Sequence, residues 1–144
     1  MSIYKEFSEY TPVSRLSGLQ WFTLEKRLTL EKRSNMICEY VFKSQPKLLN
    51  IGRGEVRELI IQRVLAKEPL SPISDYSDPD YQYSGDRENN QYHAILQKHF
   101  SYSFDGTFIH PDHLESSDSY SIIDLDGASE IVLWKNHKTL LKEI

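Results

Sequence analysis

The chain has 144 residues, of which 39% are hydrophobic, 12% aromatic and 26% charged. This aromatic content, with a formal net charge of only -4, excludes a disordered chain and predicts one packed domain over 1–144. The acidic balance argues against a nucleic-acid binder, and no apolar run approaches the roughly 20 residues that span a bilayer. The single cysteine, Cys38, cannot form an internal disulfide, which favours a reducing, cytoplasmic location.

Short alternating, β-branched or aromatic segments predict strands along most of the chain. The first four strands are expected at 3–7, 19–23, 36–42 and 47–51. Three more are expected at 107–109, 120–125 and 129–134, with Asp105–Gly106 and Asp126–Gly127 as turns. The last residues, 136–144, are expected to form a tail.

Three segments predict helices. The first is 23–34, where TLEKRL is followed by TLEKRS and Thr23 can serve as the N-cap. The second is 55–67, which has apolar residues at helical spacing, and the third is 91–100. The irregular polar stretch 68–91 is expected to be a loop, whose tyrosines either stack on a ligand or pack back on the domain.

Two histidines three residues apart, His110 and His113, lie close to Glu115 in the sequence and have metal-ligand chemistry. A mononuclear site needs a further ligand, and none follows at a recognisable spacing. A polar surface loop without a metal is therefore the simpler interpretation, and a metal-dependent hydrolase is a weaker alternative. Cys38 lies in the middle of the expected strand MICEYVF, which indicates a buried small hydrophobe and not a nucleophile.

A carboxylate stands near the start of the otherwise apolar strand expected at 129–134, where Glu130 precedes Ile-Val-Leu. Burying a carboxylate costs several kcal/mol unless it is paired. A glutamate at the start of a strand can also be exposed, so the pattern alone leaves both interpretations open.

The order of these segments resembles the ADP-ribosyltransferase-like fold over roughly residues 3–142. The segments that carry the resemblance are IYKEF (3–7), WFT (21–23), EYVF (39–42), KLLNI (47–51), FDG (104–106) and SEIVL (129–133). In that family the first acid of the last of these strands is the catalytic glutamate, and here that position holds Glu130.

The resemblance implies a single α+β domain with two small, mainly antiparallel sheets around a cleft and about three helices. It implies NAD as cofactor, cleavage of the nicotinamide–ribose bond and modification of a macromolecular acceptor such as a protein. Glu130 would be the catalytic residue, stabilising the positive charge of the transition state. The implied cofactor-binding residues are Lys5 for a phosphate or ribose, Trp21 or Phe22 together with the loop tyrosine Tyr83 for the nicotinamide ring, and Thr23 for the ribose or the glutamate.

The sequence departs from the family pattern at Lys5, where an arginine is expected. Lysine lacks the planar fork that binds a phosphate through two hydrogen bonds. The alternative is therefore a catalytically inactive interaction or structural protein on an α+β scaffold. Convergence of Glu130, Thr23 and Lys5 in one cleft would favour the enzyme.

Overall fold

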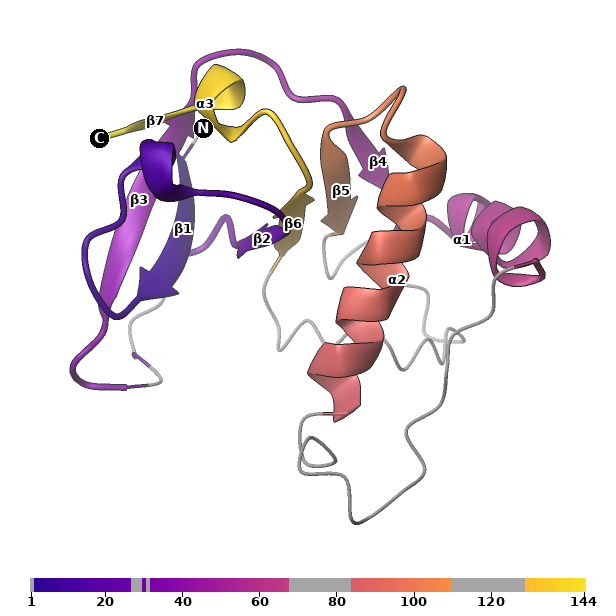
Figure 1. Ribbon diagram of the computed structural model, residues 1–144, viewed down its shortest axis with the longest axis horizontal. Coiled ribbons are helices and arrows are strands. Elements are labelled where there is room, and N and C mark those ends of the chain that lie inside the picture. The colour runs from indigo at the N-terminus through magenta and orange to yellow at the C-terminus, as the bar shows by residue number, and fades with distance from the viewer. Residues whose placement is uncertain (1, 27–29, 31, 68–83, 110–128) are drawn as a thin grey trace.

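The computed structural model describes residues 2–26, 30, 32–67, 84–109 and 129–144, with the backbone alone for 84–89. Within these ranges, strands and helices follow one another in mixed order (Figure 1). The strands are β1 (Ser2–Phe7), β2 (Gln20–Phe22), β3 (Met36–Phe42), β4 (Leu48–Asn50), β5 (Gly106–Ile109), β6 (Glu130–Leu133) and β7 (Leu141–Glu143). The helices are η1 (Val13–Arg15), α1 (Gly54–Ile60), η2 (Ile61–Leu65), α2 (Ser84–Phe100) and α3 (His137–Leu140).

The strands form two separate sheets. One is three-stranded, in the order β1-β3-β7, and both of its pairs are antiparallel. The other is four-stranded, in the order β2-β6-β5-β4, and only its β4–β5 pair is parallel. This arrangement confirms a small α+β fold with two mainly antiparallel sheets and, in the described part of the chain, three α-helices.

A backbone bridge between Tyr4 and Thr23 joins the two sheets. The amide of Tyr4 in β1 donates to the carbonyl oxygen of Thr23 at 2.8 Å, and the amide of Thr23 donates back at 3.0 Å. Thr23 directly follows β2, so the bridge places the end of the four-stranded sheet against the middle of β1. The three strands predicted to carry site residues, β1, β2 and β6, therefore meet at this junction.

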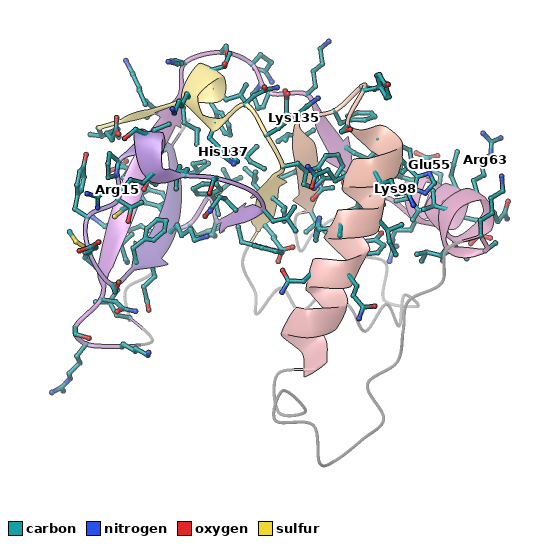
Figure 2. All side chains as sticks on the ribbon, viewed as in Figure 1. Arg15, Glu55, Arg63, Lys98, Lys135 and His137 are labelled. Atoms are coloured by element: carbon teal, nitrogen blue, oxygen red, sulfur yellow. The ribbon has the colours of Figure 1, made fainter. Side chains whose placement is uncertain are left out.

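The four-stranded sheet is buried on both faces. One face packs against the three-stranded sheet through an inter-sheet cluster of Ile3, Val13, Leu16, Phe22, Cys38, Tyr40, Ile131, Leu133, Leu140 and Leu141. The other packs against α1, η2 and α2 through a helix-side cluster of Ile51, Ile60, Val64, Tyr92, Leu96, Ile109, Val132 and Trp134. In Figure 1, α2 lies across the four-stranded sheet, and Figure 2 shows side chains between the two sheets. The cleft expected between the sheets stays a prediction.

The helix predicted over 23–34 is wrong where the structure describes that segment, at 23–26, 30 and 32–34. Thr23 does act as a cap, but of a turn: its Oγ1 accepts a hydrogen bond from the Glu25 amide at 3.2 Å. Such local side-chain hydrogen bonds compete with a helix. Thr23 is also held in an extended position by its bridge to Tyr4. The chain therefore continues after β2 as a turn and not as a helix.

The tail expected at 136–144 is also wrong. It contains α3 and then β7, which pairs with the end of β3. The imidazole of His137, labelled in Figure 2, anchors this segment, with Nε2 2.8 Å from the carbonyl oxygen of Gly18. Lys135, labelled in the same figure, donates to the carbonyl oxygen of Ser101 after α2.

The predicted helix at 55–67 is confirmed as α1 and η2, which has π-helical hydrogen bonding. The loop expected over 68–91 is too long, because α2 already begins at Ser84. Residues 68–83 lie outside the described part of the chain, as do the strand expected at 120–125 and the turn at 126–127.

Gly106 allows β5 and β6 to approach each other. A Cβ atom at this position would lie 1.9 Å from the carbonyl oxygen of Val132, which is backbone and cannot rotate away. Since β5 and β6 form the centre of the four-stranded sheet, this clash can be removed only by moving the two strands apart.

We expect Gly106→Ala to lower the free energy of unfolding by at least about 2 kcal/mol, because the two strands must separate. Gly18→Ala is the matched control: Gly18 has a φ of +64° and open space around it, so only backbone strain of about 1 kcal/mol applies. Urea unfolding of both variants measures the difference. Equal losses would show that the β5–β6 contact relaxes freely.

Candidate functional site

Glu130 is the first residue of β6, where it pairs with Ile109 of β5. Alternation along the strand puts Glu130 on the same face as Val132, which belongs to the helix-side cluster. Its side chain is 15% exposed, so this carboxylate is mostly removed from water. Of the two positions that the sequence left open for Glu130, the structure is nearer to the buried one, with part of the side chain still exposed.

A buried histidine of α2 lies close to this carboxylate. Nε2 of His93 lies 3.9 Å from Oε1 of Glu130, and the His93 side chain is fully buried. Burial lowers the pKa of His93 to about 3, so the imidazole is uncharged at neutral pH and the two side chains are not an ion pair.

Trp21 completes this group from β2. Its indole meets the His93 ring edge-on, with centroids 5.7 Å apart and an interplanar angle of 85°. Trp21 pairs with Val132 across the sheet, so its side chain shares the helix-side face with Glu130. We call Trp21, His93 and Glu130 the carboxylate cluster. It combines an aromatic face, a neutral imidazole and a carboxylate in a largely dry setting.

Thr23 directly follows β2 and Glu130 begins β6. Because Phe22 pairs with Ile131, the next position of this antiparallel register places Thr23 opposite Glu130. Its hydroxyl does not turn to Glu130 in this structure: Oγ1 donates to Oε2 of Glu25 at 2.8 Å. The same Glu25 oxygen accepts from the amide of Ser129 at 3.0 Å and from its hydroxyl at 2.7 Å. Thr23 is thus tied to the residue that precedes Glu130.

Lys5 lies on the other face of the four-stranded sheet. Its Nζ donates to Oε1 of Gln20 at 2.6 Å and sits 5.2 Å and 5.8 Å from the ring centroids of Phe7 and Phe22. Burial lowers the pKa of the Lys5 ammonium to about 8. Phe22 also belongs to the inter-sheet cluster and packs edge-on against Tyr40.

The structure therefore brings together Trp21, Thr23 and Glu130, and separates them from Lys5 and Phe22 by the thickness of the sheet. Tyr83, the remaining residue expected at the nicotinamide ring, lies outside the described residues. Sequence reasoning missed His93, although its signal was present. His93 precedes Leu96 by three positions, so a helix that buries Leu96 can bury His93 as well.

Other candidate chemistry is limited in the described ranges. No group of three or more His, Cys, Asp or Glu side chains there is placed to hold a metal ion, and His110, His113 and Glu115 lie outside them. Cys38 is a free, buried thiol in β3, as expected. None of the described helices has the length and apolar character needed to cross a bilayer.

In comparisons with known proteins, no protein-family model matches the chain, and no curated protein or solved structure matches it. The resemblance to the ADP-ribosyltransferase-like fold thus stays a prediction from the sequence.

Burial of His93 predicts a pH-dependent stability. Below pH 6.5 the unfolded chain binds a proton at this imidazole, whereas the folded chain does so only near pH 3, so folding stability falls as the solution is acidified. We expect this group to remove about 2 kcal/mol between pH 7 and pH 5. The difference in urea-unfolding free energy between wild type and His93→Phe measures it. An equal pH slope in both proteins would contradict a buried, neutral His93.

The lowered pKa of Lys5 makes the folding stability depend on pH in the alkaline range. Its folded pKa of about 8 lies below the ordinary 10.5, so between these values the unfolded chain binds more protons and stability rises with pH. Relative to Lys5→Met, we expect wild type to gain about 1–2 kcal/mol from pH 7 to pH 10, less than the full shift because the amine is partly exposed. Unfolding at a series of pH values tests this. A constant difference would show that the amine is well solvated.

Proposed function

We propose that the chain is an ADP-ribosyltransferase-like protein that uses NAD and modifies a macromolecular acceptor, with Glu130 as its catalytic carboxylate. The observation that carries the proposal is the setting of Glu130. A mostly buried carboxylate at the start of a central strand lies beside an uncharged imidazole, which in turn packs edge-on against an indole ring. An apolar side chain would pack at this position at lower cost.

Electrostatics explains what such a carboxylate can do. Attraction between opposite charges grows as water is removed, because the effective dielectric constant falls. A carboxylate fixed in a largely dry site therefore stabilises a positive charge that develops next to it, without having to reorganise at the moment of reaction. Since His93 is uncharged at neutral pH, it does not cancel this field.

The residues around Glu130 fit one end of NAD. Bound NAD would supply a ribosyl carbon that becomes positively charged as its bond to nicotinamide breaks. The Trp21 ring offers a flat surface for the nicotinamide, and Glu130 offers the stabilising charge. Thr23 would contribute by fixing the end of β2, since its hydroxyl already bonds Glu25.

The fit does not extend to Lys5, and this observation favours a second candidate. Lys5 lies on the face of the sheet opposite Glu130 and is held by Gln20, so it cannot grip a phosphate of a molecule bound at Glu130 in this arrangement. The second candidate is a catalytically inactive protein that keeps the scaffold for binding a protein partner. For either role we propose a cytoplasmic location, which the free thiol of Cys38 supports.

Substitution of Glu130 separates the two candidates. For the enzyme, we expect Glu130→Gln to lower the rate of nicotinamide release from NAD at least about 100-fold, because the neutral amide cannot stabilise the positive charge. Transfer of a labelled ADP-ribosyl group to protein acceptors is measured alongside. The control is Glu55→Gln on α1, whose side chain is 77% exposed and 3.8 Å from Arg53. It should keep the wild-type rate.

A wild-type protein that neither binds NAD nor releases nicotinamide would refute the enzymatic proposal and leave the inactive scaffold. NAD binding without nicotinamide release, unchanged by Glu130→Gln, would also refute Glu130 as the catalytic carboxylate. Both variants are compared with wild type by circular dichroism, so that misfolding is not mistaken for lost chemistry.

A further inference from the structure

The carboxylate of Glu25 accepts three hydrogen bonds, two of them from Ser129, which directly precedes Glu130. Its Oε2 accepts from the Thr23 hydroxyl at 2.8 Å, the Ser129 hydroxyl at 2.7 Å and the Ser129 amide at 3.0 Å. The Ser129 hydroxyl in turn accepts from the amide of Leu24 at 3.1 Å. We call these four bonds the Glu25 clasp. It joins two segments that are 104 residues apart in the chain.

The Glu25 clasp holds the residue directly before Glu130, at the start of β6. The pairing of β2 with β6 ends at Phe22 and Ile131, one residue short of Glu130. The clasp then continues the connection by holding the residue on the other side of Glu130, Ser129. Glu130 is therefore fixed between a strand pair that follows it and the clasp that precedes it.

The clasp depends on a charged acceptor. Hydrogen bonds to an ionised carboxylate are shorter and roughly twice as strong as those between neutral groups. Partial desolvation alone would raise the pKa of Glu25, but the hydrogen bonds from Ser129 and Thr23 outweigh it and lower the pKa. An amide in place of the carboxylate would keep an acceptor oxygen but lose the negative charge.

We infer that Glu25 is a positioning residue for Glu130: it fixes the start of β6 and so holds the Glu130 carboxylate next to His93. This inference rests on the proposed function. It also assigns Thr23 an indirect role, since its hydroxyl donates to Glu25 and so orients that carboxylate.

Glu25→Gln tests the inference with two measurements. The first is amide hydrogen exchange over 129–133, which needs no activity; we expect exchange there to rise at least tenfold, with α2 unchanged. The second is the kinetics of nicotinamide release, for which we expect kcat to fall about tenfold with KM for NAD unchanged. Loss of stability alone would speed exchange throughout the core, α2 included, and not at one strand end only. Glu58→Gln on α1, an exposed glutamate that accepts one hydrogen bond from Gln62, is the control and should change neither.

Ser129→Ala is the second variant if Glu25→Gln does not fold. It removes the hydroxyl that donates to Glu25 and accepts from Leu24, and it leaves the Ser129 amide in place, so the same changes are expected at smaller size. A folded Glu25→Gln or Ser129→Ala protein with wild-type exchange and kcat would overturn the inference alone. A wild-type protein without NAD binding or nicotinamide release would overturn the proposed function, and the positioning role with it.

Discussion

The rest of the structure depends on one strand that is buried on both faces. β6 pairs with β2 on one edge and β5 on the other, and its side chains alternate between the inter-sheet cluster and the helix-side cluster. Ile131 and Leu133 join the two sheets, while Val132 holds the helices. A shift of one residue in its pairing would exchange all of these contacts at once. The register of β6, and with it the side on which Glu130 lies, is therefore fixed by the packing of the whole domain.

This constraint divides the candidate site residues. β2 alternates in the same way as β6, so Trp21 shares a face with Glu130 while Phe22 packs between the sheets. Lys5 follows the alternation of β1, in which Ile3 and Phe7 also point to the inter-sheet cluster. The resemblance assigns these residues to one site, but the five that the structure describes lie on the two opposite faces of the four-stranded sheet. Tyr83 lies outside the described residues. The carboxylate cluster is the part that combines charge, burial and an aromatic face.

The sequence predicts most strands of the two sheets correctly, because these strands have a recognisable composition or alternation of their own. β-branched and aromatic residues identify β3, β5 and β6, and alternation identifies β1. The helix expected after Thr23 fails because Thr-x-Glu is equally suited to a helix start and to a turn. The choice is made by Tyr4 and Ser129, which are distant in sequence. The short β7 has too little pattern of its own and forms because β3 offers it an edge. His93 was overlooked because a polar residue on a buried helix face looks like a solvent position.

The carboxylate cluster lowers the stability of the domain, and this cost indicates that its polar residues do not serve packing alone. His93 is fully buried, and neither of its ring nitrogens has a hydrogen-bond partner among the described residues. Unsatisfied polar groups of this kind cost about 1–3 kcal/mol each, which a phenyl ring at the same place would avoid. The mostly buried Glu130 adds a desolvation cost. A core selected for packing alone would favour apolar groups at both positions. The side chain of Glu130 is 15% exposed and its Oε1 is out of contact with solvent, so the dielectric around this carboxylate is low, which is the condition under which a fixed charge acts most strongly on a bound molecule.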